Sequence, residues 1–323
     1  MSRRPPPREI DAAAAVLRRG GLVAFPTETV YGLGADAANP EALRRLYRVK
    51  GRPPGHPVIV HIGARADLDD FARDVPEDAG ALTRAFWPGP LTLVLRRRRD
   101  RVADEAAGGR DTVGLRVPAH PVALALLESF GAGVAAPSAN RFGRVSPTTA
   151  EHVRADLGAD VDVVLDGGPC AVGVESTIVD LTGPEPRVLR EGGISAEELE
   201  GVLGRPVPVG GTTAAPGTLP SHYAPHARVE LVATAGEAAT RTATHTAAGR
   251  RVGLLALLGD VTAAAPGAVV LDPPPDVDEY ARVLYARLRE ADRLGLDVLV
   301  AVAPPPNGIG AAVRDRLRRA AGG

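Results

Sequence analysis

The chain has 323 residues, of which 45% are hydrophobic and 24% are charged, and its formal net charge at pH 7 is -1. A length of this order is typical of two domains, and the balanced charge gives no global attraction to nucleic acid or to an anionic membrane. The lone cysteine, Cys170, excludes internal disulfides, and no apolar run approaches the roughly 18 residues of a membrane span. We therefore expect a cytoplasmic protein without membrane contact.

The first predicted elements are a helix over residues 9–19 and a strand over 22–26, which Pro26 ends. The segment GLGADA at 32–37 resembles the dinucleotide-binding pattern GxGxxG. Ala37 replaces the last glycine of that pattern, so the match is weak.

The next helix begins at Asn39, a capping residue followed by proline, and ends at Lys50, since Gly51 is a typical helix stop. Arg52 follows, and then an apolar strand over 57–62. Lys50 and Arg52 thus lie on a constrained connection that leads into a buried strand. Two cations at such a place favour phosphate or carboxylate binding, the alternative being an ordinary solvated loop.

Lys50 is the only lysine of the chain, and every other basic residue is arginine. An ammonium is a compact point charge, whereas a guanidinium is a planar fork. A lysine retained in so arginine-rich a chain indicates a cation that must reach a crowded anion, although chance survival of one surface lysine explains it equally well. His61, on the apolar strand, would by itself more often be a core histidine than a ligand contact.

The middle of the chain is predicted to continue with helices over 64–73 and 76–86, a turn over 87–90, strands over 91–96 and 112–118, a helix over 119–130, a helix from Ser146–Pro147 through 157, and short strands within 161–168, 176–181 and 187–193. This order favours an α/β fold with a mixed, twisted sheet. The basic run over 96–101 could bind RNA, but its position at a strand end favours a solvated hairpin loop.

Residues 205–227 break all periodicity and are typical of a linker, yet a neutral spacer would not need His222, Tyr223 and His226. Beyond them, strands near 229–233, 251–256, 268–271 and 297–303 alternate with helices near 236–248, 276–293 and 309–320. This alternation predicts a small parallel α/β domain.

The usual catalytic signatures are absent from the sequence: there is no Walker loop, no zinc-spaced Cys/His cluster and no GxSxG. What remains is a dispersed set of cations, hydroxyl groups and one amide near strand ends: Lys50, Arg52, Arg116 and Arg190, with Thr27, Thr29, Thr112, Ser138, Asn140, Ser146, Ser176 and Thr177. Each alone is more often a turn or a cap. Together they indicate a cavity that binds a polyanion.

Seven segments, in this order, resemble the YrdC/TsaC family: PTETVYGLGADA, KGRPPGHPVIVHI, FWPGPLTLVL, VGLRVPAHP, APSANRFGRVSPTT, GGPCAVGVESTIVDL and VLREGGIS. APGTLPSHYAP and the segment after it resemble the long two-domain form of that family. The resemblance implies a YrdC-like catalytic domain over 1–204 with a twisted mixed sheet around a large cavity, a linker and active-site lid with an HYAP motif over 205–227, and a small Rossmann-like α/β domain over 228–323.

The resemblance also implies an activity. The family makes L-threonylcarbamoyladenylate from L-threonine, bicarbonate and ATP and releases pyrophosphate, which is the first step of N6-threonylcarbamoyladenosine formation at tRNA position 37. Mg²⁺ accompanies ATP, and the resemblance implies no metal ligand from the protein. The downstream partner is the tRNA threonylcarbamoyl transferase machinery, and weak direct binding of tRNA stays open.

By resemblance, Lys50 and Arg52 are the catalytic residues, and the ATP site comprises Lys50, Arg52, His56, Thr112, Ser138, Asn140, Ser146, Arg190 and Tyr223. The threonine site comprises Thr29, His61, Arg116, Ala136 and Ser176. A bidentate pair between Arg116 and the threonine carboxylate is the expected anchor. Tyr223 is expected to reach over the site from the lid.

Two alternatives stay open at this point. One is a sister enzyme of the same fold that carbamoylates or adenylates another small substrate, which would alter the threonine pocket and leave Lys50, Arg52 and Ser138 unchanged. The other is a module that binds double-stranded RNA or tRNA through a basic face. Such a module would show salt-dependent RNA affinity and no need for ATP or threonine.

Overall fold

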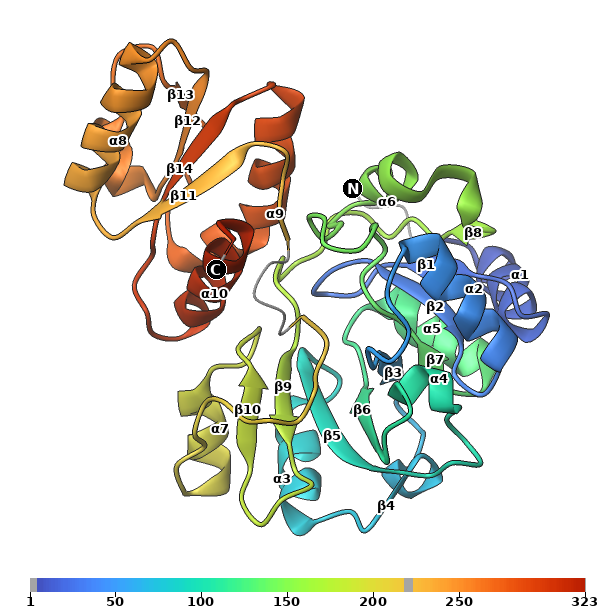
Figure 1. The fold of residues 1–323 in the computed structure, drawn as a ribbon. Coiled ribbons are helices and arrows are strands. Elements are labelled where there is room, and N and C mark those ends of the chain that lie inside the picture. Colours follow the sequence, from blue (N-terminus) through green and yellow to red (C-terminus); the bar gives the residue numbers. More distant parts are fainter. Residues whose placement is uncertain (1–4, 218–222, 323) are drawn as a thin grey trace. The chain divides into compact units, whose positions relative to one another are not determined.

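The computed structural model describes residues 5–217 and 223–322, which form two compact units (Figure 1). Unit 1 comprises Met1–Phe142, Ser146–Ala171 and Glu175–Thr218, and unit 2 comprises Gly143–Val145, Val172–Val174 and Leu219–Gly323. Two short segments that interrupt unit 1 along the sequence therefore belong to unit 2.

Unit 1 contains, in chain order, α1 (Pro7–Arg18), β1 (Val23–Phe25), β2 (Gly32–Asp36), α2 (Pro40–Lys50), β3 (Ile59–His61), the 3-10 turn η1 (Leu68–Asp70), β4 (Ala72–Arg73), α3 (Glu77–Phe86), β5 (Leu91–Arg97), α4 (Asp104–Ala107), β6 (Thr112–Arg116), α5 (Pro121–Phe130), β7 (Val134–Ala135), α6 (Ala150–Leu157), η2 (Gly158–Asp160), β8 (Val163–Val164), β9 (Thr177–Asp180), β10 (Arg187–Arg190) and α7 (Ala196–Leu203). Its strands form one sheet in the order β10-β9-β5-β6-β3-β7-β2-β1-β8, with β4 paired to β5.

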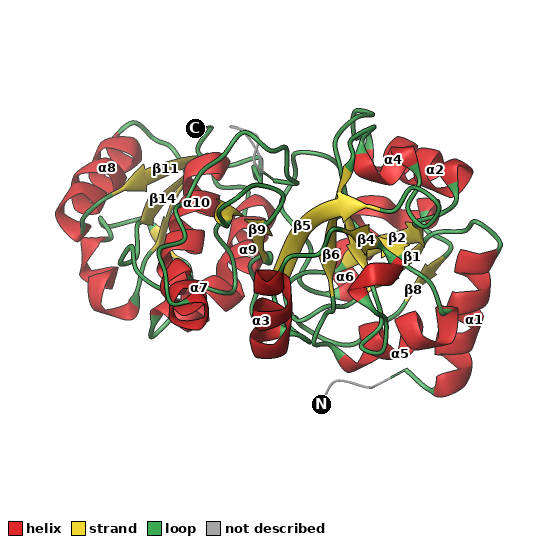
Figure 2. Cartoon of the chain, turned by 90° about the horizontal axis from the view of Figure 1, so that it is seen from below, coloured by secondary structure: helices red, strands yellow, loops and turns green. Residues whose placement is uncertain are grey.

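The sheet of unit 1 mixes parallel and antiparallel pairs and is buried on both faces. β3 runs parallel to β6 and antiparallel to β7, and β5 runs parallel to β9 and antiparallel to β6. Side chains alternate along a strand, so Val23 and Phe25 pack against α1 and α5, while Leu22 and Ala24 belong to a separate cluster that α2 joins. Figure 2 shows α1 and α5 together, apart from α2 and α4.

Unit 2 contains β11 (Arg228–Val232), α8 (Ala235–Ala247), β12 (Val252–Leu255), η3 (Leu258–Ala263), β13 (Val269–Val270), α9 (Val277–Arg293), β14 (Val298–Val302) and α10 (Ile309–Ala320). All of its strand pairs are parallel, and the sheet order is β11-β14-β12-β13. The predicted fold class, a mixed α/β sheet followed by a smaller parallel α/β domain, is confirmed.

Helix α2 is formed as its sequence predicts, and it places Lys50 as its last residue. The Asn39 side chain accepts hydrogen bonds from the backbone N–H groups of Glu41 and Ala42. Gly51 ends the helix with φ 63°, a left-handed conformation that costs glycine little. Both ends of the helix are therefore fixed by local chemistry, which sets the position of Lys50 along the chain.

Two predicted helices differ from the structure. Residues 64–73 are not a helix, because Asp67 caps the single turn η1 and Ala72–Arg73 pairs with β5 as strand β4. The helix expected from Ser146 begins instead at Ala150, with Thr149 as its cap.

The basic run is not a solvated loop throughout. Arg96 and Arg97 extend β5, and Arg97 is 1% exposed, paired with Asp104 and bonded to the Val102 carbonyl at 2.8 Å.

The predicted linker over 205–227 has ordered parts in both units. In unit 1, Val209 bridges to Val188, Thr213 donates to Asp180 at 2.5 Å, and Ala215 joins a small apolar cluster. Residues from 223 onward belong to unit 2. His222 lies outside the described residues. The domain boundaries and the lid role of this segment stay predictions.

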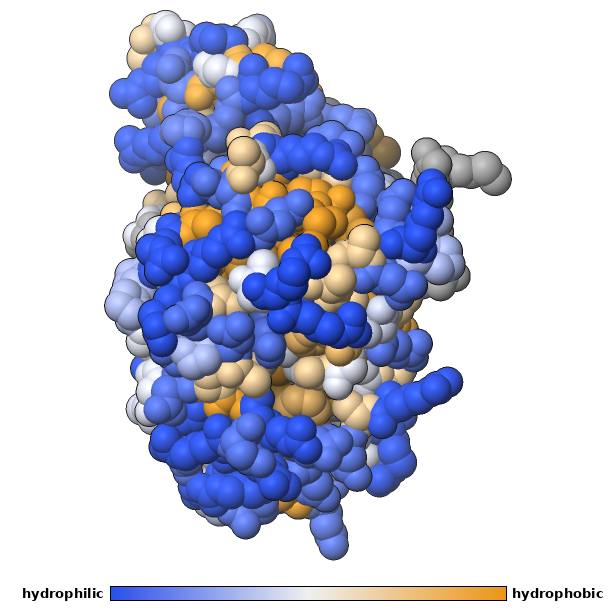
Figure 3. Space-filling view, turned by 90° about the vertical axis from the view of Figure 1, so that its right-hand side faces the viewer, coloured by the Kyte–Doolittle hydropathy of each residue, from blue (hydrophilic) through white to orange (hydrophobic). Residues whose placement is uncertain are grey.

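Hydrophilic side chains predominate on the face shown in Figure 3, with a smaller apolar area near its centre. Large apolar side chains exposed among the described residues are Val202, Val209, Leu258, Val269 and Val270. No helix of the described chain is long and apolar enough to cross a membrane.

Asn39→Ala should lower the free energy of unfolding by about 1 kcal/mol, because two backbone N–H groups of α2 lose their acceptor. Chemical denaturation measures the loss. Asn39→Asp is the matched control, since a carboxylate caps as well as an amide and should retain wild-type stability. Equal destabilisation in both variants would contradict a capping role.

Candidate active site

Lys50 is deeply buried in unit 1, with 2% of its surface exposed. Its ammonium donates to the carbonyl oxygens of Ser138 at 2.6 Å and of Asn140 at 2.5 Å. Burial, reinforced by the nearby Arg52 cation, lowers the pKa of Lys50 well below its usual value. The structure thus joins three predicted site residues, and it leaves the third ammonium hydrogen of Lys50 without a carboxylate partner among the described residues.

Arg52 lies beside this group and is oriented by its surroundings. One of its terminal nitrogens donates to the Pro57 carbonyl at 3.0 Å, and its guanidinium lies 5.7 Å from the centre of the Phe142 ring. The His56 ring meets the same Phe142 ring edge-on, with 6.0 Å between centroids. The Phe142 N–H donates to the Lys50 carbonyl at 2.8 Å. Phe142 therefore links two predicted nucleotide residues to Lys50.

Arg116, at the end of β6, is the centre of a second buried group. It is 3% exposed, its Nε donates to the Gly89 carbonyl at 3.1 Å, and its Nη2 donates to Glu28 at 2.7 Å and to the Thr29 hydroxyl at 3.0 Å. Its Nη1 has no partner among the described residues. Both hydrogens of Nη2 are used, so the bidentate carboxylate pair expected from the sequence would require the bond to Thr29 to open.

His61 lies beside Arg116, because the two residues are register partners of the parallel pair β3–β6. It is 3% exposed, its ring meets Phe25 edge-on at 5.9 Å, and its Nδ1 has no hydrogen-bond partner within the described chain. Burial, with the Arg116 cation, lowers the pKa of His61 to about 3. His61 is therefore neutral at pH 7. Ala136 lies on the neighbouring strand segment, where its N–H donates to the Ile59 carbonyl at 2.8 Å.

Ser176 and Arg190 form a third group. Arg190 is 5% exposed and donates through Nε and Nη2 to the Ser176 carbonyl, at 3.2 and 2.8 Å, and through Nη1 to the Pro216 carbonyl at 2.9 Å. The Ser176 hydroxyl shares a hydrogen bond of 2.8 Å with Thr92. The family resemblance implies that Ser176 contacts threonine and Arg190 the nucleotide, so the two predicted subsites meet here.

Ser146 is fully buried and donates its hydroxyl to Glu175 at 2.7 Å. One predicted residue of unit 1 stands apart from these groups. Thr112 begins β6, the strand that Arg116 ends, and faces Arg96 across the ladder.

Tyr223 belongs to unit 2, where its ring lies 5.6 Å from Tyr285 and 5.3 Å from the Arg316 guanidinium. It is 1% exposed and has φ 63°, so in this structure it packs inside unit 2.

Four residues that the sequence did not place in the site contact residues that it did: Glu28, Thr92, Phe142 and Glu175. The signal for Glu28 and Glu175 was available, since each is a charged residue beside an apolar strand. Thr92 carries no such signal. Its partner, Ser176, lies 84 positions away.

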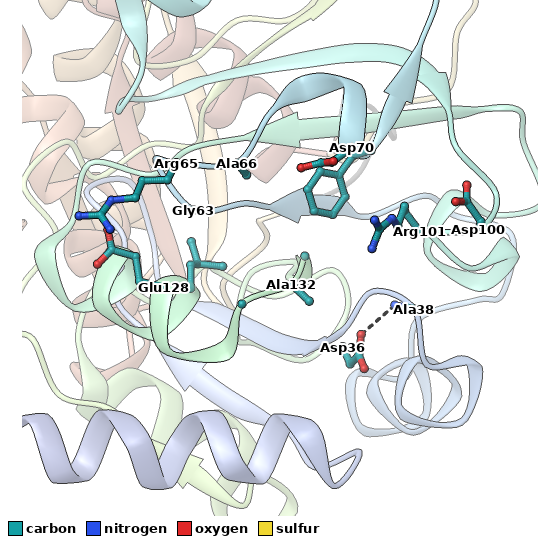
Figure 4. Close-up of a pocket in the computed structure, with 14 residues that line it drawn as sticks. Asp36, Ala38, Gly63, Arg65, Ala66, Asp70, Asp100, Arg101, Glu128 and Ala132 are labelled. Atoms are coloured by element: carbon teal, nitrogen blue, oxygen red, sulfur yellow. Dashed lines mark hydrogen bonds between the residues drawn. The ribbon is translucent and has the colours of Figure 1, made fainter.

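A cavity of about 430 Å³ lies elsewhere on unit 1 and contains none of the predicted site residues. Phe71, Leu127 and Ala132 line it, with carboxylates and guanidinium groups around them. Figure 4 shows Arg65 directed toward Glu128 across this cavity. The charged groups of the lining are exposed, apart from the half-buried Asp36, so the cavity has no fully buried charged group like Lys50.

Cys170 is buried, and burial raises the pKa of its thiol, which makes it a poor nucleophile. No group of three or more His, Cys, Asp or Glu within the described residues could hold a metal ion. The arrangement is therefore one of fixed cations and hydroxyl groups. Such a site suits the binding and alignment of anionic substrates more than covalent catalysis.

Comparisons with known proteins agree on one family. A Sua5/YciO/YrdC family model, described as telomere recombination, matches residues 15–192, and a model of the threonylcarbamoyl-AMP synthase C-terminal domain matches 194–322. The threonylcarbamoyl-AMP synthase of Pyrococcus abyssi is 42% identical over 97% of this chain and 94% of its own, and that of Bacillus subtilis is 40% identical over 98% and 93%. The crystal structure of P. abyssi Sua5 complexed with L-threonine superposes with a TM-score of 0.93 at 40% identity, covering 99% of this chain and 96% of that one.

The His61 imidazole should remain neutral between about pH 5 and 8, because its folded pKa lies far below the unfolded value of about 6.5. Below about pH 6.5 the unfolded chain binds a proton that the folded chain does not, so this residue makes stability fall as the pH decreases toward 3. NMR titration of the imidazole signals measures the pKa, and His61→Gln identifies the signal. A midpoint near 6.5 for that signal would contradict the buried, neutral state.

Proposed function

Because the chain belongs to the Sua5/YciO/YrdC family, in the form that carries the threonylcarbamoyl-AMP synthase C-terminal domain, we propose that the three buried groups of unit 1 form the site of its reaction. The activity is synthesis of L-threonylcarbamoyladenylate, and its substrates include ATP and L-threonine. We further propose bicarbonate as the third substrate and pyrophosphate as the second product.

The observation that carries this proposal is the set of buried cations. Lys50, Arg52, Arg116 and Arg190 are each at most 7% exposed, and Arg116 is paired with Glu28. Burial of positive charge is costly, and hydrogen bonds to carbonyl oxygens, such as those of Lys50, lower that cost without removing it. A site that holds several buried cations is therefore stabilised when a polyanion such as a triphosphate enters.

Threonine would bind at the Arg116 group. Its carboxylate would accept from Arg116 Nη1, the nitrogen that no described residue uses. His61 Nδ1, buried and without a hydrogen-bond partner in the described chain, supports a polar ligand group beside it. Neutral His61 keeps a lone pair on one ring nitrogen, so it can accept a hydrogen bond from a polar group of the ligand.

The reaction then proceeds in two steps. The threonine nitrogen attacks the carbon of bicarbonate-derived carbon dioxide, loses a proton and becomes a carbamate. A carbamate oxygen attacks the α-phosphorus of ATP, the bond to the bridging oxygen breaks, and pyrophosphate leaves. Negative charge accumulates on both reactants, so Lys50, Arg52 and Arg190 would act through positioning and charge stabilisation.

Mg²⁺ would enter as the ATP complex. The described residues offer no cluster of three candidate ligands, so the phosphates would carry the ion, and the protein would contribute the surrounding cations.

The product would pass to the tRNA threonylcarbamoyl transferase machinery that modifies adenosine 37, and we propose the cytoplasm as the place of action. Direct tRNA binding receives little support from the basic run. Arg98 pairs with Asp100, and Arg99 pairs with Asp104 and Asp111. These guanidinium groups already have carboxylate partners, which a phosphate would have to displace.

The decisive test of the function is pyrophosphate release from ATP and Mg²⁺, with threonine and bicarbonate omitted in turn. Release that needs both is expected. Release with another amino acid in place of threonine would mean that the pocket serves a different substrate. No release under any condition, together with salt-dependent RNA binding, would favour the RNA-binding alternative.

Lys50→Met should abolish pyrophosphate release and weaken ATP binding about tenfold to hundredfold, because a charge-assisted contact to phosphate is lost. The triphosphate favours the charged ammonium and raises the lowered pKa of Lys50. Wild-type ATP binding should therefore be linked to proton uptake by Lys50, which is measured above the pKa of ATP itself so that the nucleotide does not contribute.

Calorimetry in two buffers of different ionisation enthalpy measures this uptake. Arg48→Met, an exposed cation on the same helix, is the control and should behave as wild type. Proton uptake that persists in Lys50→Met would assign it to another group.

A further inference from the structure

Two buried glutamates support the site and are assigned to neither substrate. Glu28 is 7% exposed and Glu175 is 6% exposed. Each accepts a hydrogen bond from a predicted substrate residue, Glu28 from Arg116 and Glu175 from Ser146. Arg116 is expected to contact threonine and Ser146 is expected to contact the nucleotide, so the two carboxylates support different halves of the site.

Glu28 is well placed to fix the orientation of Arg116. Its Oε2 accepts from the backbone N–H of Ala119 at 3.0 Å, and this anchors the carboxylate to the chain. Its Oε1 accepts from Arg116 Nη2 at 2.7 Å, and the second hydrogen of Nη2 goes to Thr29. The guanidinium is thereby held in one rotation, with Nη1 as its available donor.

Glu175 has a comparable effect on Ser146, through the single hydrogen that a hydroxyl can donate. Ser146 donates that hydrogen to Glu175 Oε1 at 2.7 Å. A carboxylate has no hydrogen to return, so the Ser146 oxygen keeps only lone pairs for a ligand. It can then accept from a hydroxyl of the nucleotide sugar or contact a cation, but it cannot donate to a phosphate oxygen.

We propose that Glu28 and Glu175 are positioning residues that set the hydrogen-bond polarity of the two halves of the site. Glu28 leaves Arg116 one donor toward the threonine carboxylate, and Glu175 makes Ser146 an acceptor toward the nucleotide. This inference rests on the proposed function, and it predicts that each glutamate affects one substrate and not the other.

The experiment compares Glu28→Gln and Glu175→Gln with wild type by calorimetric binding of threonine alone and of ATP alone, and by the KM of each substrate in pyrophosphate release. Glu28→Gln should weaken the binding of threonine about tenfold to hundredfold, which is the effect of one disturbed charge-assisted hydrogen bond. It should leave the affinity for ATP within about twofold of wild type. Glu175→Gln should weaken ATP about tenfold, because the amide can donate to Ser146 and reverse its polarity, and it should leave threonine unchanged.

Binding of L-threoninamide distinguishes a positioning role of Glu28 from a merely structural one. It lacks the carboxylate, so its weaker binding should be the same in wild type and Glu28→Gln. Glu128→Gln, an exposed glutamate on α5, is the matched surface control and should match wild type throughout. If Glu28→Gln does not fold, Glu28→Asp retains the charge but shortens the side chain, and it should show the same selective loss of threonine.

The inference is overturned if either glutamine variant weakens the binding of both substrates equally, or if neither variant weakens the binding of any substrate. It is also overturned if Glu28→Gln lowers the affinity for threoninamide as much as the affinity for threonine. Failure of the proposed function is a separate result, visible in wild type as absent threonine-dependent pyrophosphate release.

Discussion

The burial of cations is the constraint on which the arrangement of unit 1 depends. Lys50, Arg116 and Arg190 are each at most 5% exposed. A buried cation needs oxygen partners, and strand ends supply them as carbonyl groups. Ser138 and Asn140 provide them after β7, and Ser176 provides one just before β9. The mixed sheet thus supplies the partners of these side chains, and helices on both faces cover the sheet.

The cations are not equivalent in how they are compensated, and this difference separates the two kinds of substrate. Arg116 has a buried carboxylate, Glu28, so its net charge in the empty site is already neutralised. Lys50 bonds to carbonyl dipoles, which lower the cost of its charge but do not cancel it. A zwitterionic amino acid suits the first environment, because it brings no net charge. A triphosphate suits the second.

Local chemistry predicted much of the fold, and long-range pairing decided the rest. Asn39 and Gly51 fix both ends of α2 within a few residues, so that helix and the place of Lys50 could be read from the sequence. Ser146 has the same local signal, a hydroxyl before a proline, but its hydroxyl bonds to Glu175, 29 positions away, and the helix begins later. Arg97, inside a basic run, is buried because Asp104 and the Val102 carbonyl compensate it. The rotation of Arg116 likewise depends on Glu28, 88 positions away, and no local pattern encodes such a distance.

The single lysine has a consequence for how this chain can be handled and regulated. A lysine-specific endoprotease has one internal bond to cut, between Lys50 and Gly51, and that bond follows a buried side chain at the end of α2. Cleavage therefore requires the end of α2 to unfold locally. The appearance of the two fragments would then report that the candidate site has opened. The presence of a single lysine has the same consequence inside a cell. Any acylation or conjugation of a lysine side chain in this protein falls on Lys50, so such a modification cannot occur without altering the candidate site.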